Sequence, residues 1–210
     1  MRVLPRGLYA ITPEEPDTDR LLVLVRAALV GGAAAIQYRS KDAPGALRFE
    51  QARALVELCR EYRVQLIVND DVDIAGETGA DGAHLGAEDG DLVAARQQLG
   101  PDKLLGVSCY NRLDLALAAK EAGADYVAFG SVFASPTKPG AVRAPLALFA
   151  EARRAVGLPL VAIGGITPAN AHLVIAAGAD ALAVISAVFA APDVTARASD
   201  FQRLFERPSP

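Results

Sequence analysis

Polar and charged side chains follow the apolar runs of this sequence at points where chemistry could take place. The stretch "IQYRSK" carries Gln37, Arg39 and Lys41 at alternate positions, and side chains alternate in direction along a strand. An amide and two cations on one face suit an anionic substrate better than a packed interior. A solvated strand end is the alternative for Arg39 and Lys41, and these residues alone do not decide between the two.

Carboxylates follow the next two apolar runs. The first run, "LIVNDD", provides Asn69, Asp70 and Asp71, and the second, "HLGAEDGD", provides Glu88, Asp89 and Asp91. A few oxygen ligands beside cations that could hold phosphates predict a Mg2+ site. Acidic residues near a helix start often serve only as caps. That alternative applies to Glu88 and Asp89 more than to Asp70, which directly follows the run "LIV".

A glycine pair and a long loop complete the candidate site. Gly164 and Gly165 in "AIGGITPAN", together with the helix start expected after "VISAV", predict a backbone phosphate site, although a simple tight turn is the alternative. The connection "GSVFASPTKPGAVRAP" (130–145) exceeds the usual ~2–6 residues of a strand-to-helix loop. It carries Lys138 and Arg143 and no acidic residue. Ser108 in "VSCYN" either points into the same site or caps the following helix.

Nucleophilic catalysis by a side chain is not indicated. His84 lies inside the run "GAHLG", where a structural, hydrogen-bonded role is expected, and His172 is expected to be exposed. Cys109 has no base supplied by the surrounding sequence, so packing is the expected role of this residue.

Short strand-like runs alternate with segments of helical period along the chain. The runs are "GLYAIT", "AAIQYR", "QLIVND", "GAHLG", "KLLGVS", "YVAFG", "LPLVAIGG" and "ALAVIS". Eight strand–helix units with right-handed crossovers predict an α/β fold of the closed (β/α)8, or TIM, barrel type. An open doubly wound sheet is the alternative, but its first turn is usually glycine-rich and "ITPEEPDTD" has no glycine. Barrel active sites lie at the carboxyl ends of the strands, so the candidate residues would share one mouth.

Two local patterns and the domain boundaries follow from the same alternation. In "GALRFEQARALVELCREYR", Leu47, Ala54, Leu55 and Leu58 are expected on one helical face. Three helices are expected to end in Gly-Ala-Asp, where glycine can take the left-handed position. No linker interrupts the chain, so a single catalytic domain is expected over residues 1–206, with a disordered tail at 207–210.

Bulk composition excludes several classes of protein. The 210 residues are 52% hydrophobic and carry a net charge of -4 without blocks of like charge, which does not favour nucleic-acid binding. Neither a signal core nor an unbroken apolar stretch of ~20 residues is present, so no membrane association is expected. The two cysteines lack metal-ligand spacing, and a reduced, cytoplasmic setting is expected.

The motifs, taken in order, resemble those of the thiamine-phosphate synthase (thiamine-phosphate pyrophosphorylase) family. They are "IQYRSK", "IVNDDVDIA", "GADGAHLGAED", "GVSCYN", "GADYVAFGSVFASPTK" and "AIGGITPAN", and the resemblance runs from "LYAIT" to "VISAV". It implies a (β/α)8 transferase of the alkyl-transferring class in thiamine biosynthesis. Such an enzyme joins 4-amino-5-hydroxymethyl-2-methylpyrimidine diphosphate to thiazole phosphate and releases pyrophosphate. The implied partners are two phosphorylated small molecules, with a homo-oligomeric state left open.

The resemblance also implies the roles of individual residues. The pyrimidine diphosphate would be bound by Gln37, Arg39, Lys41, Asn69, Ser108 and Lys138, and catalysis would involve Arg39, Lys41, Ser108 and Lys138. The cofactor Mg2+ would be held by Asp70 and Asp89. Thiazole phosphate would be bound by Ser135, Thr137, Gly165, Ile185 and Ser186. Ser135, Asp71 and Ala87 depart from the residues usual in the family, but none of these changes removes an implied ligand.

Two alternatives share the expected fold. A related thiazole tautomerase would lose part of the diphosphate and metal set, which this chain retains. A non-catalytic sensor of a phosphorylated ligand would not need carboxylates to activate a leaving group. In the synthase, the long loop would act as a lid that closes over both substrates and excludes water.

Overall fold

The computed structural model describes residues 3–86, 90–134 and 142–206. Parallel strands form a closed barrel in chain order, β1 through β8, with β8 pairing back onto β1. The strands are β1 (Gly7–Ile11), β2 (Ala35–Tyr38), β3 (Gln65–Asn69), β4 (Gly82–Gly86), β5 (Leu104–Ser108), β6 (Tyr126–Phe129), β7 (Leu160–Ile163) and β8 (Ala181–Val184). All eight expected strands are confirmed, and barrel closure rules out the open sheet.

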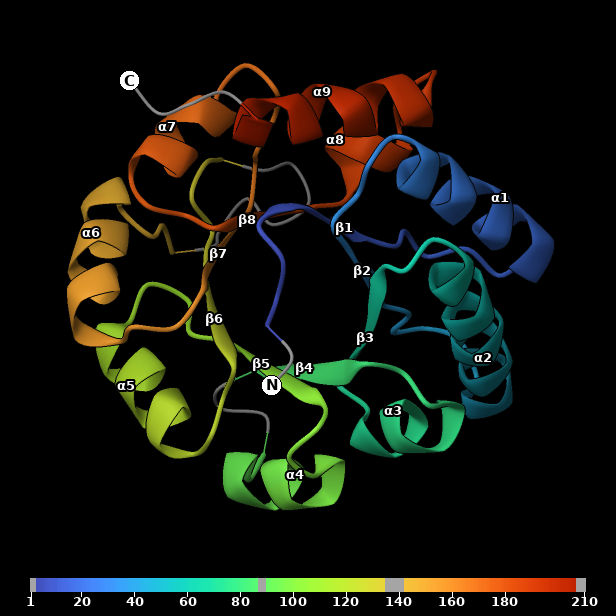
Figure 1. Ribbon diagram of the computed structural model, residues 1–210, viewed down its shortest axis with the longest axis horizontal. Helices are drawn as coiled ribbons and strands as arrows, with labels where there is room; N and C mark the ends of the chain where they lie inside the picture. The colour runs from blue at the N-terminus through green and yellow to red at the C-terminus, as the bar shows by residue number, and fades with distance from the viewer. Residues whose placement is uncertain (1–2, 87–89, 135–141, 207–210) are drawn as a thin grey trace.

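Helices form a ring around the barrel (Figure 1). They are α1 (Thr18–Val30), α2 (Gly45–Glu61), α3 (Val72–Thr78), α4 (Leu92–Leu99), α5 (Leu113–Glu121), α6 (Leu146–Ala155), α7 (Ala171–Ala176), α8 (Ser186–Phe189) and α9 (Val194–Glu206). As expected, α6 begins at Leu146. None of the helices in the described ranges is long and apolar enough to cross a membrane.

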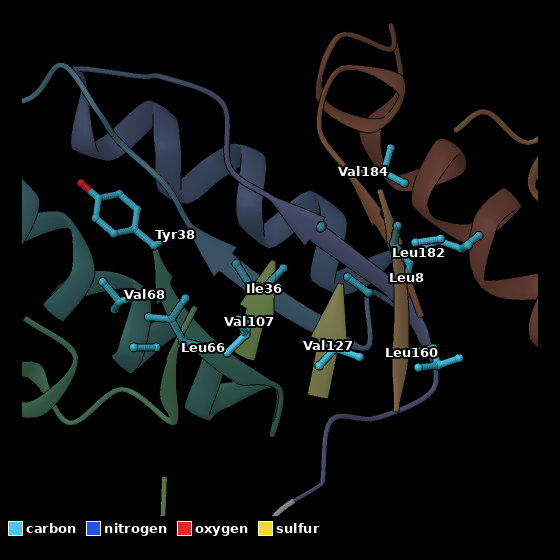
Figure 2. Packing of buried hydrophobic residues seen from close by; sticks show 14 of the residues in the cluster. Leu8, Ile36, Tyr38, Leu66, Val68, Val107, Val127, Leu160, Leu182 and Val184 are labelled. Atoms are coloured by element: carbon cyan, nitrogen blue, oxygen red, sulfur yellow. The ribbon is translucent and has the colours of Figure 1, made fainter. Parts of the chain in front are cut away.

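Strand side chains alternate between two apolar cores. Leu8, Ile36, Leu66, Val107 and Val127 point outward and pack beneath the helices (Figure 2). The opposite face of the strands fills the barrel interior with a smaller cluster that includes Tyr9, Ile67, Leu104, Tyr126 and Val161. This period-2 division places the inward residues nearest the carboxyl ends of the strands at the mouth.

The residues expected on the buried face of α2 are only partly confirmed. Leu55 and Leu58 are buried, but Leu47 and Ala54 are half-buried. The buried stripe is instead made by Gln51, Ala52, Leu55, Val56, Leu58 and Cys59. The stripe includes Gln51 because its side chain accepts a hydrogen bond from the Tyr38 hydroxyl, which satisfies both polar groups inside the core.

The repeated Gly-Ala-Asp sequence has a structural role at the amino ends of the strands. Each glycine has a positive φ, at Gly79 (73°), Gly123 (92°) and Gly178 (109°), as expected for a helix end. The aspartate that follows pairs reciprocally with a leucine of the preceding strand. The Asp125 backbone N–H donates to the Leu105 carbonyl, and the Asp125 carboxylate accepts from the Leu105 N–H at 2.7 Å.

Two further strand pairs contain the same reciprocal clamp. Asp81 pairs with Leu66, and Asp180 pairs with Leu160. Between β1 and β2 the corresponding sequence is Gly-Ala-Ala, so Ala34 occupies the position of the aspartate and no carboxylate is present there. Here the Leu8 N–H donates instead to Oε1 of Gln202, from α9, at 3.2 Å. The last helix therefore supplies the acceptor that the local sequence lacks.

We expect Asp125→Ala to lower the free energy of unfolding by about 1–3 kcal/mol, because the buried Leu105 N–H loses its acceptor. Urea unfolding followed by circular dichroism measures this loss. Asp114→Ala is the control, since Asp114 forms an exposed ion pair with Arg112, and we expect a much smaller loss because solvent screens such a pair. Equal losses in the two variants would contradict the clamp.

Candidate active site

The strand ends bring together most of the described candidate residues. Asn69 and Ser108 are the last residues of β3 and β5, and Asp70 directly follows β3. Gln37 lies near the end of β2 with its side chain buried in the barrel. Parallel closure therefore places these side chains around one mouth, as the sequence predicted.

A chain of hydrogen bonds crosses the barrel interior beneath this mouth. Nε2 of Gln37 donates to the Tyr9 hydroxyl at 2.9 Å, and the Tyr9 and Tyr126 hydroxyls are 2.8 Å apart. The Tyr126 hydroxyl lies 3.1 Å from Nδ1 of His84, whose Nε2 lies 2.8 Å from Oγ of Ser108. We call these five residues the interior relay. It connects Gln37 with Ser108, two residues that the family resemblance implies for one substrate.

All members of the interior relay except the half-buried Ser108 are buried, and burial controls the ionisation of the relay. Desolvation lowers the pKa of His84 to about 4, so its imidazole is neutral near pH 7. Burial also raises the pKa of Tyr9 and of Tyr126, so both hydroxyls keep their protons. Gly106 provides the room, because a Cβ there would lie 2.0 Å from the Tyr126 ring. His84 is thus a hydrogen-bonded interior residue, as expected.

The residues after β2 are held by a carboxylate. Glu14 accepts from the Lys41 backbone N–H at 2.8 Å and from the Ser40 hydroxyl at 2.9 Å, and it lies 3.5 Å from the Arg39 guanidinium. The Thr12 hydroxyl accepts from the Arg39 backbone N–H at 2.9 Å. Both positioning residues come from the segment that follows β1. They fix the backbone from which the two cations project.

Asp70 is placed so that its carboxylate meets one of those cations, Lys41. Its backbone has a left-handed φ of 61°, and its N–H donates to the His84 carbonyl at 2.8 Å. Its carboxylate lies 3.6 Å from the Lys41 ammonium, and its side chain is 40% exposed. Neither contact is that of a helix cap, so the alternative of a capping role does not apply to Asp70.

The neighbouring acids have structural partners. Asp71 caps α3 by accepting from the Ile74 N–H, and it pairs with Arg48 at 3.1 Å. Asp91 caps α4 by accepting from Val93 and Ala94. Glu88 and Asp89 lie outside the described residues.

The described donor set is compatible with Mg2+ but not with a closed metal cage. No group of three or more His, Cys, Asp or Glu residues that could hold a metal occurs within the described ranges. Mg2+ usually takes only one or two protein carboxylates and completes its shell with water and substrate phosphates. Asp70 alone, exposed beside a cation, fits that pattern.

The glycine pair after β7 is shaped by the start of the long loop. Gly164 and Gly165 have φ values of 102° and 64°. A Cβ on Gly165 would lie 2.4 Å from the Ala134 carbonyl oxygen, and one on Gly164 would lie 2.2 Å from the Ser131 hydroxyl oxygen. The Phe133 N–H also donates to the Gly164 carbonyl at 3.0 Å. Any residue with a Cβ at position 164 or 165 would collide with the start of the loop. The pair therefore does more than form a tight turn, because it lets the loop pack against β7.

The remaining candidates divide into two groups. Ile185 lies at the amino end of α8, and Ser186 is its first residue, so the expected helix start after β8 is confirmed. Ser135, Thr137 and Lys138 lie outside the described residues, together with the centre of the expected lid. The two arms of that loop pair with each other, since Ser131 donates to Val142 and Ala144 donates to Ser131.

The sequence interpretation missed Tyr9, Tyr126, Thr12 and Glu14. The two tyrosines could have been found by extending the alternation rule to every strand, because Tyr9 faces inward like Gln37. Glu14 follows the end of β1, where barrel active sites are built. Cys109 is buried, and burial raises the pKa of its thiol to about 12, in agreement with a packing role.

Known proteins resemble this chain over nearly its whole length. The family model described as thiamine monophosphate synthase matches residues 8–188. A thiamine-phosphate synthase of Thiobacillus denitrificans is 58% identical over 205 residues, which cover 98% of this chain and 97% of that protein. One of Aromatoleum aromaticum is 59% identical, covering 96% of this chain and 97% of that protein. The solved thiamine phosphate pyrophosphorylase of Pyrococcus furiosus superposes with a TM-score of 0.83 at 40% identity, covering 95% of each chain.

We expect His84 to make the stability of the fold depend on pH. Because its pKa is lowered from 6.5 to about 4, the unfolded chain takes up a proton in this window that the folded chain does not. The contribution is fully present above pH 6.5 and is lost as pH falls toward 4, by roughly 3 kcal/mol in total. Urea unfolding at pH 7 and pH 5 measures the first part of the loss. The exposed His172 provides the control His172→Asn, which should keep the same dependence, and titration of His84 near pH 6.5 by NMR would contradict the prediction.

Proposed function

Because this chain belongs to the thiamine-phosphate synthase family, a family of transferases in thiamine biosynthesis, we propose the following reaction for it. The enzyme joins 4-amino-5-hydroxymethyl-2-methylpyrimidine diphosphate to thiazole phosphate and releases pyrophosphate and thiamine phosphate. The observation that carries the proposal is the shared mouth, where Lys41 lies beside Asp70 and where the interior relay ends at Ser108 on the neighbouring part of the barrel rim.

The diphosphate is bound by the cations of the mouth. Arg39 and Lys41 project from a backbone held by Glu14. Lys138, which lies outside the described residues, is the third cation that the family resemblance implies. Diphosphate carries more charge than the single carboxylate of Glu14 or Asp70, so it competes effectively for these cations. Lys41 is half exposed and lies 3.6 Å from Asp70, which leaves its ammonium accessible to a ligand.

The residues that would hold Mg2+ are Asp70 and Asp89. The metal supplies positive charge to the leaving diphosphate and so adds to the charge of Arg39, Lys41 and Lys138. Asp71 and Asp91 are committed to helix caps and remain outside the ligand set.

The reaction needs little acid–base chemistry. The bond between the pyrimidine methylene carbon and the diphosphate oxygen breaks, and its electron pair leaves with the diphosphate. The thiazole nitrogen then forms the new carbon–nitrogen bond with its own lone pair, so no proton has to be removed from the nucleophile. A neutral His84 and a protonated Cys109 are consistent with a site that works by charge stabilisation and positioning.

The two substrates occupy adjacent parts of the mouth. Gln37, Asn69 and Ser108 bind the pyrimidine ring, since they lie on β2, β3 and β5. Thiazole phosphate is bound by Gly165 after β7, by Ile185 and Ser186 after β8, and by Ser135 and Thr137, which lie outside the described residues. Gly165 contacts the start of that loop, so the β6 and β7 segments would act together on this substrate.

We expect the purified protein to form thiamine phosphate and pyrophosphate when both substrates and Mg2+ are supplied. Liquid chromatography of the products provides the measurement. Addition of EDTA should stop the reaction, and excess Mg2+ should restore it. A folded protein that makes no thiamine phosphate would overturn the proposal. Isomerisation of the thiazole phosphate alone would instead support a tautomerase.

We also expect Lys138→Ala to lower kcat by at least about tenfold while the thermal midpoint changes little, because the proposed role of Lys138 is to stabilise the charge of the leaving diphosphate. The matched control is Lys120→Ala on the exposed face of α5, which removes the same charge away from the mouth. Normal turnover of the Lys138 variant at saturating substrate concentrations would show that the assigned role is wrong.

A further inference from the structure

The interior relay contains Tyr9, Tyr126 and His84, which the reaction above does not use directly. We propose that these positioning residues fix the Ser108 hydroxyl as a hydrogen-bond donor toward the pyrimidine ring. The inference rests on the proposed function, because it concerns the substrate that Ser108 binds. Its physical basis is that each neutral hydroxyl or imidazole in the chain has only one hydrogen to donate.

The Gln37 amide sets the direction of the relay. Its Nε2 faces the Tyr9 hydroxyl, and an amide nitrogen can only donate. The Tyr9 oxygen therefore accepts, and its hydrogen is directed to the nearest acceptor, the Tyr126 oxygen at 2.8 Å. The Tyr126 hydrogen is directed in turn to Nδ1 of His84.

The tautomer of His84 follows from that direction. With Nδ1 acting as the acceptor, the single hydrogen of the neutral ring sits on Nε2 and points to Oγ of Ser108 at 2.8 Å. Suppose instead that each hydrogen bond ran from Ser108 toward Tyr9, with the Gln37 nitrogen still facing Tyr9. The Tyr9 oxygen would then accept from both Tyr126 and Gln37. Its hydrogen would then have no acceptor among the hydrogen bonds of the described residues, an unfavourable state for a hydroxyl that is fully buried.

Burial favours the neutral ring that this argument requires. His84 is 6% exposed, it stacks on the Tyr126 ring at a centroid distance of 5.6 Å, and it faces two hydroxyls that keep their protons. The T-shaped contact between Tyr9 and Tyr126, with centroids 6.0 Å apart, holds the other half of the relay. The chain is thus fixed by packing as well as by hydrogen bonding.

The consequence for substrate binding is chemical. Ser108 accepts from His84, so its own hydrogen remains available to an acceptor such as a pyrimidine ring nitrogen. A donor of fixed direction that a bound ligand removes from water discriminates strongly, because a ligand without the matching acceptor leaves that donor unpaired. The relay would therefore select rings that present a nitrogen lone pair to Ser108.

Kinetics of Tyr126→Phe, Ser108→Ala and the double variant test the coupling. We expect Tyr126→Phe to raise KM for the pyrimidine diphosphate about 5–10-fold, the effect of roughly one hydrogen bond, with kcat and KM for thiazole phosphate within about twofold. Ser108→Ala should raise the same KM at least as much, and the double variant should match Ser108→Ala. Effects that multiply in the double variant would overturn the proposal, because the two residues would then act independently.

Tyr38→Phe is the matched control. It removes a buried tyrosine hydroxyl that donates to Gln51 beneath α2, outside the relay, and we expect it to leave KM for the pyrimidine diphosphate unchanged. An equal rise in KM in this variant would also count against the relay, since it would show a general effect of losing a buried hydroxyl.

NMR of the wild-type protein labelled with 15N-histidine gives a readout that needs no activity. The chain has two histidines, and His172→Asn assigns the signals. We expect His84 to carry its hydrogen on Nε2. A hydrogen on Nδ1 would overturn the proposal, because it would require the Gln37 oxygen to face Tyr9 and the Ser108 hydrogen to be used by His84. If the wild type makes no thiamine phosphate, the proposed function fails whatever the tautomer. If it is active with the Nδ1 tautomer, only the relay fails.

Discussion

The hydrogen bond between Tyr9 and Tyr126, 2.8 Å long, determines much of what the barrel interior can contain. Two phenol groups placed away from water must each find partners inside the protein, because an unpaired buried hydroxyl is costly. Gln37 provides a partner on one side and His84 on the other. The ring of Tyr126 in turn requires glycine at position 106, where any side chain would collide with that ring. A buried hydrogen-bond network of this kind tolerates few substitutions. In return, its hydrogen bonds have defined partners all the way to the mouth.

Charge at the mouth is organised by the segments that follow the strands. Glu14 holds the backbone that carries Arg39 and Lys41, and Asp70 lies beside the Lys41 ammonium. The cations are thus in place before a ligand arrives, so little reorganisation has to accompany binding of an anion. The neutral relay beneath them adds no charge of its own. The mouth therefore combines a charged rim with an uncharged floor, which suits a substrate that has a diphosphate at one end and an aromatic ring at the other.

The sequence predicted the barrel and its eight strands because alternation of apolar runs with helical segments reports directly on parallel topology. It also placed Gln37, Asn69, Asp70 and Ser108 at strand ends, since position in a strand determines position in a barrel. Partners that depend on packing across the barrel were beyond its reach. The pairing of Tyr9 with Tyr126 joins residues 117 positions apart, and the role of Glu14 depends on a loop geometry without a local signature. The capping role of Asp71 was not identified either, because a carboxylate after a strand fits a cap and a ligand equally well.

Because of Gln202, the first strand of the barrel depends on a residue that is synthesised much later. Three leucines at strand beginnings find their carboxylate a short distance along the chain, at Asp81, Asp125 and Asp180. Leu8 instead relies on a side chain 194 positions later. During synthesis on the ribosome, β1 must therefore wait for α9 to emerge before its amino end is secured. The seam between β8 and β1 joins the first strand to the last, and α9 supplies the acceptor beside it, so distant parts of the sequence secure this edge together.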